Sequence, residues 1–203
     1  LVAVYRAEID ELSALGCEYL QFDEVPLAML CDADVRAQVA ARGVNPDMLV
    51  DNYIDVMRRI LADRPPDMTI GMHLCRGNFR GRWMAAGGYE PVAEKLFSRM
   101  PVDCFFLEYD SERAGDFRPL RFLPKEKSVV LGLVSSKSKR IETSDELRRR
   151  LDEASQFVPL DRVALSPQCG FASVAGGNDL EEEEEQAKLR LVVETAEAVW
   201  GSA

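Results

Sequence analysis

The chain has 203 residues, of which 47% are apolar and 30% charged, a composition typical of a globular domain with a substantial core. Its formal net charge of -10 disfavours nucleic acid as a partner, because an acidic chain repels a phosphate backbone. No apolar run approaches the roughly 20 residues that cross a bilayer and no signal peptide is visible, so we expect no membrane partner.

Helical and strand patterns alternate along the chain. The strand segments are short, apolar and bounded by turn or charged residues, as expected of strands buried on both faces. Thr143 or Ser144 is an expected N-cap, and the last helix is expected to end at Gly201. In chain order we predict a helix over 1–15, a strand over 17–23, a helix over 48–61, a strand over 68–73, a helix over 89–99, strands over 103–108 and 128–134, a helix over 144–157, a strand over 162–166 and a helix over 180–200.

This alternation predicts parallel strands joined by right-handed crossovers, which occur in doubly wound sheets and in (β/α)8 barrels. Polar and sulfur side chains follow successive predicted strands, and only a barrel brings all these strand ends to one point. We therefore predict an α/β fold with a (β/α)8 TIM-type barrel. Because five strands do not close a barrel, we expect residues 1–203 to be a single domain holding the C-terminal five βα units, with about three units upstream of Leu1. The side chains at the strand ends are Asp23, His73 with Cys75, Glu108, residues 135–137 and Cys169.

The single histidine of the chain, His73, lies two residues before Cys75 at a predicted strand end. Residues i and i+2 of a strand point to the same side, so the imidazole and the thiolate are expected to converge. Cys169 lies just past the last predicted strand and offers a second sulfur, with a small buried residue as the alternative reading. Because imidazole and thiolate suit zinc, Zn²⁺ is the expected cofactor.

Glu108 ends the third predicted strand after a run of apolar residues. A carboxylate at such a place needs a partner to offset its desolvation, and either a metal ion or an arginine such as Arg113 would serve. No role is assigned to Cys17, Cys31 or Cys104. An odd number of widely spaced cysteines does not resemble a disulfide framework and fits a reducing, cytoplasmic compartment.

At these residues the sequence resembles the C-terminal catalytic barrel of cobalamin-independent methionine synthase, and in particular the short single-barrel homologues of that enzyme. The HxC segment and the SPQCGFAS segment are specific in combination, whereas either alone would be a weak signal. The resemblance covers nearly the whole chain. Its matching stretches are LQFDEVPL (20–27), GMHLCRGN (71–78), FFLEYDSERAGDFRPL (105–120), VLGLVSSKSKRIET (130–143), ALSPQCGFAS (164–173) and AKLRLVVETAEAVWG (187–201).

The resemblance implies a zinc-dependent enzyme that transfers a methyl group to the thiol of homocysteine and so makes methionine. It implies zinc held by His73, Cys75, Glu108 and Cys169, and it implies that Asp23 binds the amino group of homocysteine. Zinc stabilises the thiolate, which is the attacking form of a thiol. The donor in these synthases is methyltetrahydrofolate with a polyglutamate tail, whose N5 nitrogen needs a proton as its bond to the methyl group breaks.

The sequence departs from the best-known members of this family after the fourth predicted strand. Those members carry an Asp-x-His motif whose histidine assists proton transfer, whereas this chain has Ser135-Ser136-Lys137 and no second histidine. Lys137 is our candidate catalytic residue, either as an acid or as a ligand for a carboxylate. The departure leaves the donor open between methylfolate and another methyl or alkyl donor.

Other polar residues near the predicted site have two readings each. Arg76 and Asn78 are candidate substrate-binding residues, with a structural role in their loop as the alternative. Arg113 and Arg118 are candidates either for contacts with anionic substrate groups or for surface ion pairs. The loop over 77–88 is rich in Gly and Arg, and is either a mobile lid over the barrel mouth or an ordinary connection.

Three hypotheses therefore compete. The first is zinc-dependent methyl transfer to homocysteine, with homocysteine and a methyl donor as small-molecule partners. The second is zinc-dependent alkyl transfer involving another thiol and a non-folate donor, which the missing Asp-x-His motif favours. The third is a non-catalytic, partial barrel that binds a thiol ligand or a protein partner. The sequence does not address the oligomeric state.

Overall fold

A computed structural model of the protein describes residues 1–201 and contains one sheet of five parallel strands. The strands follow one another in chain order across the sheet, and every neighbouring pair is parallel. All five predicted strands are present, with ends within two residues of the prediction. Their bounds are Tyr19–Asp23 (β1), Thr69–Leu74 (β2), Cys104–Glu108 (β3), Ser128–Val134 (β4) and Val163–Pro167 (β5).

The five predicted helices are also present. Asn45 caps one of them by accepting hydrogen bonds from two main-chain amides, and Thr143 forms a reciprocal capping box with Glu146. The last helix begins with four glutamates in its first turn, where negative charge suits the helix dipole. Their bounds are Val2–Ala14 (α1), Pro46–Ile60 (α4), Glu90–Arg99 (α5), Ser144–Ser155 (α6) and Glu182–Trp200 (α7).

Two helices between β1 and α4 escaped prediction, namely Val25–Met29 (α2) and Ala33–Ala41 (α3). The first has only five residues, and no residue of the second is buried, so neither shows the apolar stripe from which a helix is recognised. Three short 3₁₀ turns were also not predicted: Glu112–Ala114, Arg118–Phe122 and Leu160–Arg162.

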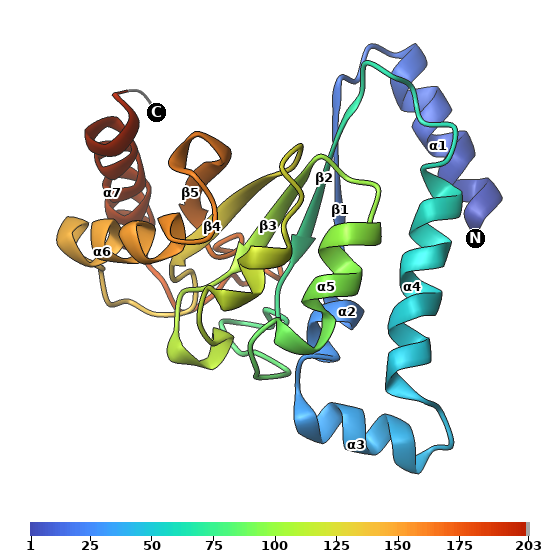
Figure 1. Cartoon of the computed structure of the whole chain (residues 1–203). Coiled ribbons are helices and arrows are strands. Elements are labelled where there is room, and N and C mark those ends of the chain that lie inside the picture. Colours follow the sequence, from blue (N-terminus) through green and yellow to red (C-terminus); the bar gives the residue numbers. More distant parts are fainter. Residues whose placement is uncertain (202–203) are drawn as a thin grey trace.

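The sheet packs its helices against one face and leaves part of the other face open. Along β1, Leu20 and Phe22 pack on the core, while the alternating Tyr19, Gln21 and Asp23 are exposed. Figure 1 shows α1 and α4 beside the β1 end of the sheet and α6 and α7 beside the β5 end. The exposed alternate residues therefore line the side of the sheet that is not covered by these helices.

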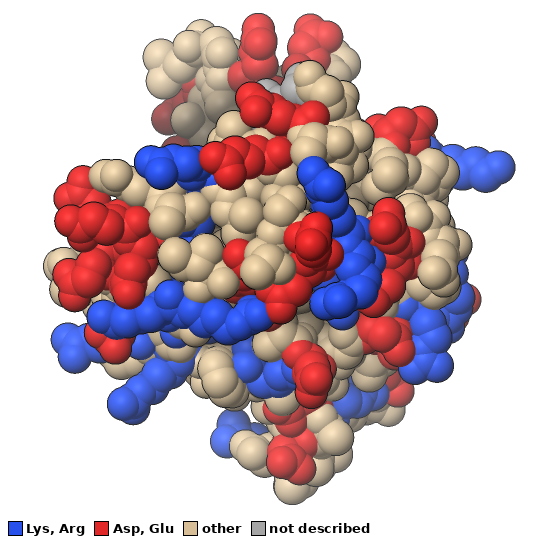
Figure 2. All heavy atoms as spheres, turned by 90° about the vertical axis from the view of Figure 1, so that its left-hand side faces the viewer, with Lys and Arg blue, Asp and Glu red and all other residues tan. Residues whose placement is uncertain are grey.

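The surface on the side of α6 and α7 carries charges of both signs. Figure 2 shows acidic and basic side chains interspersed over this face. Such mixing is typical of a solvated surface rather than of a cationic nucleic-acid interface. Within residues 1–201, no helix is both long enough and apolar enough to cross a bilayer.

A glycine in β4 allows the chain after β5 to come close to the sheet. A Cβ atom at Gly132 would lie only 2.7 Å from the Cα of Gln168, and the pairing of β4 with β5 shifts register between Gly132 and Val134. The amide of Gln168 then donates to the carbonyl of Val134. This close approach sets the position of Cys169, the next residue, at the carboxyl end of the sheet.

Candidate metal centre

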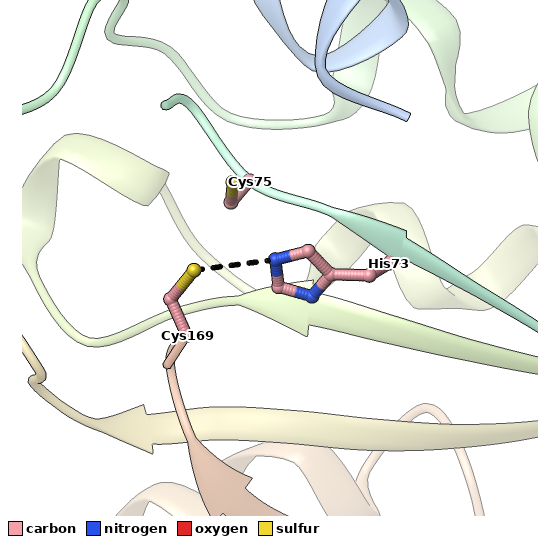
Figure 3. Close-up of side chains that lie close together, drawn as sticks. All are labelled: His73, Cys75 and Cys169. Carbon is pink, nitrogen blue, oxygen red and sulfur yellow. Dashed lines mark hydrogen bonds between the residues drawn. The ribbon is translucent and has the colours of Figure 1, made fainter. Parts of the chain in front are cut away.

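Three potential metal ligands meet at the carboxyl end of the sheet. His73 lies in β2, Cys75 is the first residue after β2, and Cys169 lies two residues after the end of β5. Their ligand atoms all lie within 4.8 Å of one another, and Cys169 Sγ is 3.7 Å from His73 Nε2 (Figure 3). Within residues 1–201 this is the only group of three or more His, Cys, Asp or Glu side chains that could hold a metal ion.

The two sulfurs of this group differ in their acidity. Hydrogen bonding from the Cys75 thiol, together with the nearby His73 and Asn78, lowers the pKa of Cys169 well below its ordinary value. The same contact with Cys169, together with burial, raises the pKa of Cys75. A bound dication would favour the thiolate form of both sulfurs. Such a site suits zinc chemically.

Glu108 ends β3 but is not part of this group. It is fully buried: Arg113 Nη2 donates to its Oε1 at 2.9 Å, and the main-chain amide of Arg76 and Gln168 Nε2 donate to its Oε2 at 2.7 and 3.2 Å. Burial raises the pKa of Glu108, but the charge of Lys137, 3.7 Å away, and these hydrogen bonds outweigh it and lower the pKa. From the sequence, either a metal ion or Arg113 was expected to offset the desolvation of Glu108. The structure contains the contact with Arg113, and ligation of a metal by Glu108 stays a prediction.

Arg76 lies in the interior rather than in a substrate cavity. Its side chain is fully buried, and its guanidinium donates to the carbonyls of Gly87 and Glu108 and to the hydroxyl of Tyr89. It also lies over the Tyr89 ring, 4.3 Å from the centroid. All three guanidinium nitrogens are thus engaged within the protein, which favours the structural alternative over the predicted substrate contact.

Asn78 joins the loop after β2 to the loop after β5. Its Nδ2 donates to the carbonyl of Gly170 at 3.0 Å, and its Oδ1 accepts from the amide of Gly81 at 3.2 Å. Because Asn78 also helps to lower the pKa of Cys169, it lies close to the thiolate. A direct contact between Asn78 and a substrate stays a prediction.

A cavity of about 230 Å³ opens beside the metal-capable group. It is lined by Asp23, His73, Phe106, Cys169 and other residues of the strand ends. Asp23 is exposed at the end of β1 and pairs in register with His73 of β2. The predicted amine-binding carboxylate and two of the predicted metal ligands therefore face one cavity.

Lys137 lies beside Glu108. Its side chain is 2% exposed, and its Nζ is 3.7 Å from Glu108 Oε2, too far for a hydrogen bond. This places the candidate acid beside Glu108, at the end of β3.

Sequence reasoning missed Gln168. Its side chain is buried, donates to Glu108 and accepts from the hydroxyl of Ser136 at 3.0 Å. It thereby connects the ends of β3, β4 and β5 directly beside Cys169. Its position within the SPQCGFAS segment was a signal of importance, but no local pattern reveals partners that are 32 and 60 residues away.

The sequence of this chain is similar to those of a known protein family. The family described as cobalamin-independent synthase, catalytic domain, matches residues 1–198. Two uncharacterized Bacillus subtilis (strain 168) proteins, YxjG and YxjH, are 45% and 44% identical to this chain over 197 and 201 residues. These matches cover 97% and 98% of this chain but 52% and 53% of the relatives, so the chain spans about half their length.

Solved structures agree in fold. A Listeria monocytogenes protein, described as a candidate vitamin-B12 independent methionine synthase, superposes with a TM-score of 0.78 at 37% identity, over 99% of this chain and 54% of its own. A B12-independent methionine synthase from Shewanella sp. W3-18-1, in complex with selenomethionine, gives a TM-score of 0.71 over 98% of this chain and 53% of its own. At 22% identity the second likeness supports the fold alone. The chain belongs to the cobalamin-independent methionine synthase family, within its catalytic domain.

Proposed function

We propose that this chain provides the zinc centre of a methyltransferase that methylates the thiol of homocysteine to give methionine. The observation that carries the proposal is the meeting of His73, Cys75 and Cys169 at the carboxyl end of the sheet, beside a cavity. In (β/α)8 barrel enzymes the active site lies at this carboxyl end of the parallel strands. Membership of the cobalamin-independent methionine synthase family supports the same reaction class.

The donor set suits catalytic zinc. One imidazole and two sulfurs give three protein ligands, and catalytic zinc sites keep a further position for substrate. Glu108 is the proposed fourth protein ligand, and it would have to exchange its present partners for the metal. When bound, zinc would stabilise the thiolate of the substrate at neutral pH.

Residues of the chain would bind and orient the acceptor. Asp23 offers an exposed carboxylate to an amino group, and it lines the same cavity as His73 and Cys169. An amino acid bound through its ammonium group at Asp23 could therefore direct its side-chain thiol towards the sulfur cluster. Fixing the thiol in this way lowers the entropic cost of reaching the transition state.

Lys137 is the candidate proton donor to the leaving group of the methyl donor. Its Nζ atom is buried and has no hydrogen-bond partner in the protein, so no protein acceptor competes with the leaving group for it. The polyglutamate form of methyltetrahydrofolate is the first donor we propose. The replacement of Asp-x-His by Ser135-Ser136-Lys137 favours a second candidate function, zinc-dependent alkyl transfer from a non-folate donor.

Metal content and methionine formation test the proposal together. We expect about one zinc per wild-type chain, and Cys169→Ala to lose most of it, because removal of one thiolate leaves two ligands of the described group. Cys104→Ala is the matched control, since Cys104 begins β3 at the opposite end of the sheet. Equal zinc in wild type and Cys169→Ala, measured by elemental analysis after dialysis, would remove Cys169 from the site.

An assay of methyl transfer to homocysteine distinguishes between the two candidate functions. Homocysteine is supplied with methyltetrahydrofolate triglutamate or with a methyl donor that has no folate ring. Methionine from the folate donor supports the first function, and methionine from the other donor alone supports the second. A zinc-loaded protein that forms no methionine with either donor would contradict methylation of homocysteine, and the second function would fail if other thiols supplied with the non-folate donor were also left unalkylated.

A further inference from the structure

The hydroxyl of Tyr89 joins the last residues of two neighbouring strands. Tyr89 is the N-cap residue of α5, and its side chain is fully buried. Its hydroxyl donates to the carbonyl of Leu74 at 2.8 Å and accepts from the amide of Glu108 at 3.0 Å. Leu74 ends β2 and Glu108 ends β3. One oxygen atom therefore fixes the spacing between these two strand ends.

The contacts of Tyr89 also flank Cys75. Leu74 comes directly before Cys75 in the chain, and Arg76 comes directly after it. Arg76 Nη1 donates to the Tyr89 hydroxyl at 3.3 Å, and its guanidinium lies over the Tyr89 ring, 4.3 Å from the centroid. The amide of Arg76 donates in turn to Glu108 Oε2 at 2.7 Å. Both chain neighbours of Cys75 are thus held by Tyr89.

A second tyrosine beside Tyr89 shows that burial of the ring does not by itself produce these contacts. Tyr109 is only 2% exposed, and its ring centroid is 5.4 Å from that of Tyr89. Its hydroxyl has no hydrogen-bond partner within residues 1–201. Of these two stacked tyrosines, it is therefore Tyr89 whose hydroxyl ties the strand ends together.

We propose that Tyr89 is a positioning residue of the candidate metal centre: by holding the main chain around Cys75, its hydroxyl keeps the Cys75 sulfur within ligand distance of His73 and Cys169. The ligand atoms of these three residues already lie within 4.8 Å of one another, so the site is arranged before a metal binds. Groups that orient the ligands of a metal contribute strongly to its affinity. The inference rests on the proposed zinc centre, but the hold on Cys75 is measurable without zinc.

Removal of the hydroxyl tests this role with almost no change in volume. Tyr109→Phe is the matched control for Tyr89→Phe, because it removes a neighbouring buried hydroxyl that has no partner within residues 1–201. In competition with a chelator, we expect Tyr89→Phe to bind zinc about tenfold more weakly than wild type, and Tyr109→Phe to bind it as wild type does. With cobalt(II) in place of zinc, Tyr89→Phe should also change the thiolate-to-metal charge-transfer absorption, because the sulfurs are held differently.

A merely structural role would not give this result. The metal affinity of the folded state does not depend on stability as long as the zinc-free protein is fully folded, which circular dichroism checks. A conservative replacement, 4-aminophenylalanine in place of Tyr89, keeps a donor for the carbonyl of Leu74. It should recover part of the lost affinity, and it replaces Tyr89→Phe in the test if that variant does not fold.

Alkylation of the zinc-free full chain measures the hold on Cys75 directly. Cys75 and Cys31 are similarly buried, at 4% and 5% exposure. We expect iodoacetamide to label Cys75 about tenfold faster in Tyr89→Phe than in Tyr109→Phe, because the lost hydrogen bonds release the chain locally. Labelling of Cys31 should be equal in the two variants. Mass spectrometry of the labelled peptides gives both rates.

Two results would overturn the positioning role. The first is equal zinc affinity and equal labelling of Cys75 in Tyr89→Phe and Tyr109→Phe. The second is a rise in the labelling of Cys31 as large as that of Cys75, since it would indicate general loosening of the fold. A wild-type chain that binds no zinc would contradict the proposed function instead, and the labelling rates would still decide whether Tyr89 holds Cys75.

Discussion

At the scale of single residues, a buried carboxylate near the candidate metal centre is held by several donors. Glu108 is fully buried, and its oxygens accept from Arg113, Gln168 and the amide of Arg76. A buried carboxylate is tolerated only when such partners offset its desolvation. Residues that were expected to contact substrate therefore contribute to the structure around Glu108.

Replacement of Arg76 tests this structural role. Arg76→Met should lower the free energy of unfolding by about 3 kcal/mol, because it leaves the partly buried carbonyl of Gly87 and the buried hydroxyl of Tyr89 with fewer partners and removes a positive charge near Glu108. Urea unfolding followed by circular dichroism measures the change. Arg82→Met, in the exposed part of the same loop, should change stability little. Equal stability of the two variants would contradict a structural role for Arg76.

At the scale of elements, the last helix fixes the loop after β4. Lys188 of α7 is fully buried, and its ammonium donates to Glu142 and to the carbonyl of Arg140. Glu142 in turn accepts from the amide of Ser135, at the start of the Ser135-Ser136-Lys137 segment. Packing of α7 thus determines where Lys137 lies, although the two are far apart in the chain.

A double-mutant cycle measures this coupling. Lys188→Met should destabilise the protein by about 3 kcal/mol, since it leaves Glu142 buried without its cation. Adding Glu142→Gln should recover part of the loss, because the amide oxygen can still accept from Ser135 and no buried charge remains. Arg190→Met, on the exposed side of the same helix, is the control. Additive effects of the two substitutions in urea unfolding would argue against the coupling.

A second ion pair joins the amino ends of two strands to the segment after α4. Arg64 donates to both oxygens of Asp103 at 2.7 Å, and the amide of Ile70 donates to the same carboxylate at 2.8 Å. Burial raises the pKa of Asp103, but these contacts outweigh it and lower the pKa below the ordinary value of 3.8. A lowered pKa stabilises the folded protein above that value, and this contribution is lost as the pH falls through the folded-state pKa.

Asp103→Asn should therefore have a pH-dependent effect. At pH 7 we expect a loss of about 1 kcal/mol in the free energy of unfolding, a modest figure because the pair is partly exposed. The difference from wild type should shrink as the pH falls below 3.8. Asp116→Asn, whose partner Arg118 is largely exposed, should show little effect at either pH. A difference that grew towards acid pH in urea titrations would contradict the assignment.

At the scale of the whole molecule, the sheet has two edges, β1 and β5, and its middle strand is β3. β3 is paired on both sides, and its Phe105 and Leu107 are buried. β1 is paired on one side only and has three exposed side chains. The two Bacillus subtilis relatives YxjG and YxjH are about twice as long as this chain. We propose that the remainder of those longer chains supplies the other strands of the barrel.

Hydrogen exchange should reflect this open arrangement. Amides of β1 are expected to exchange faster than those of β3, because one edge of β1 has no strand beside it within residues 1–201. Mass spectrometry of exchanged peptides from both strands measures the difference. Protection of β1 equal to that of β3 would mean that another surface covers this edge in solution. Repeating the exchange at two protein concentrations then shows whether a second copy is responsible.

The sequence by itself determined the alternation of strands and helices, since apolar patterns and caps are local properties of the chain. It also placed His73 and Cys75 on one side of a strand end, because strand geometry repeats every two residues. The approach of Cys169, 96 residues from His73, follows from no local pattern; it was expected from the predicted convergence of the strand ends and from the family resemblance.

Tertiary structure alone decided the partners of the buried polar groups. It brought Gln168 and Arg113 to Glu108, enclosed the guanidinium of Arg76, and left the Nζ atom of Lys137 without a hydrogen bond. These outcomes depend on contacts between segments that are distant in sequence. Those contacts decide which of several possible donors lies within hydrogen-bond distance of a buried carboxylate. Local propensity carries no information about that competition, because its result is set by the packing of the strand ends.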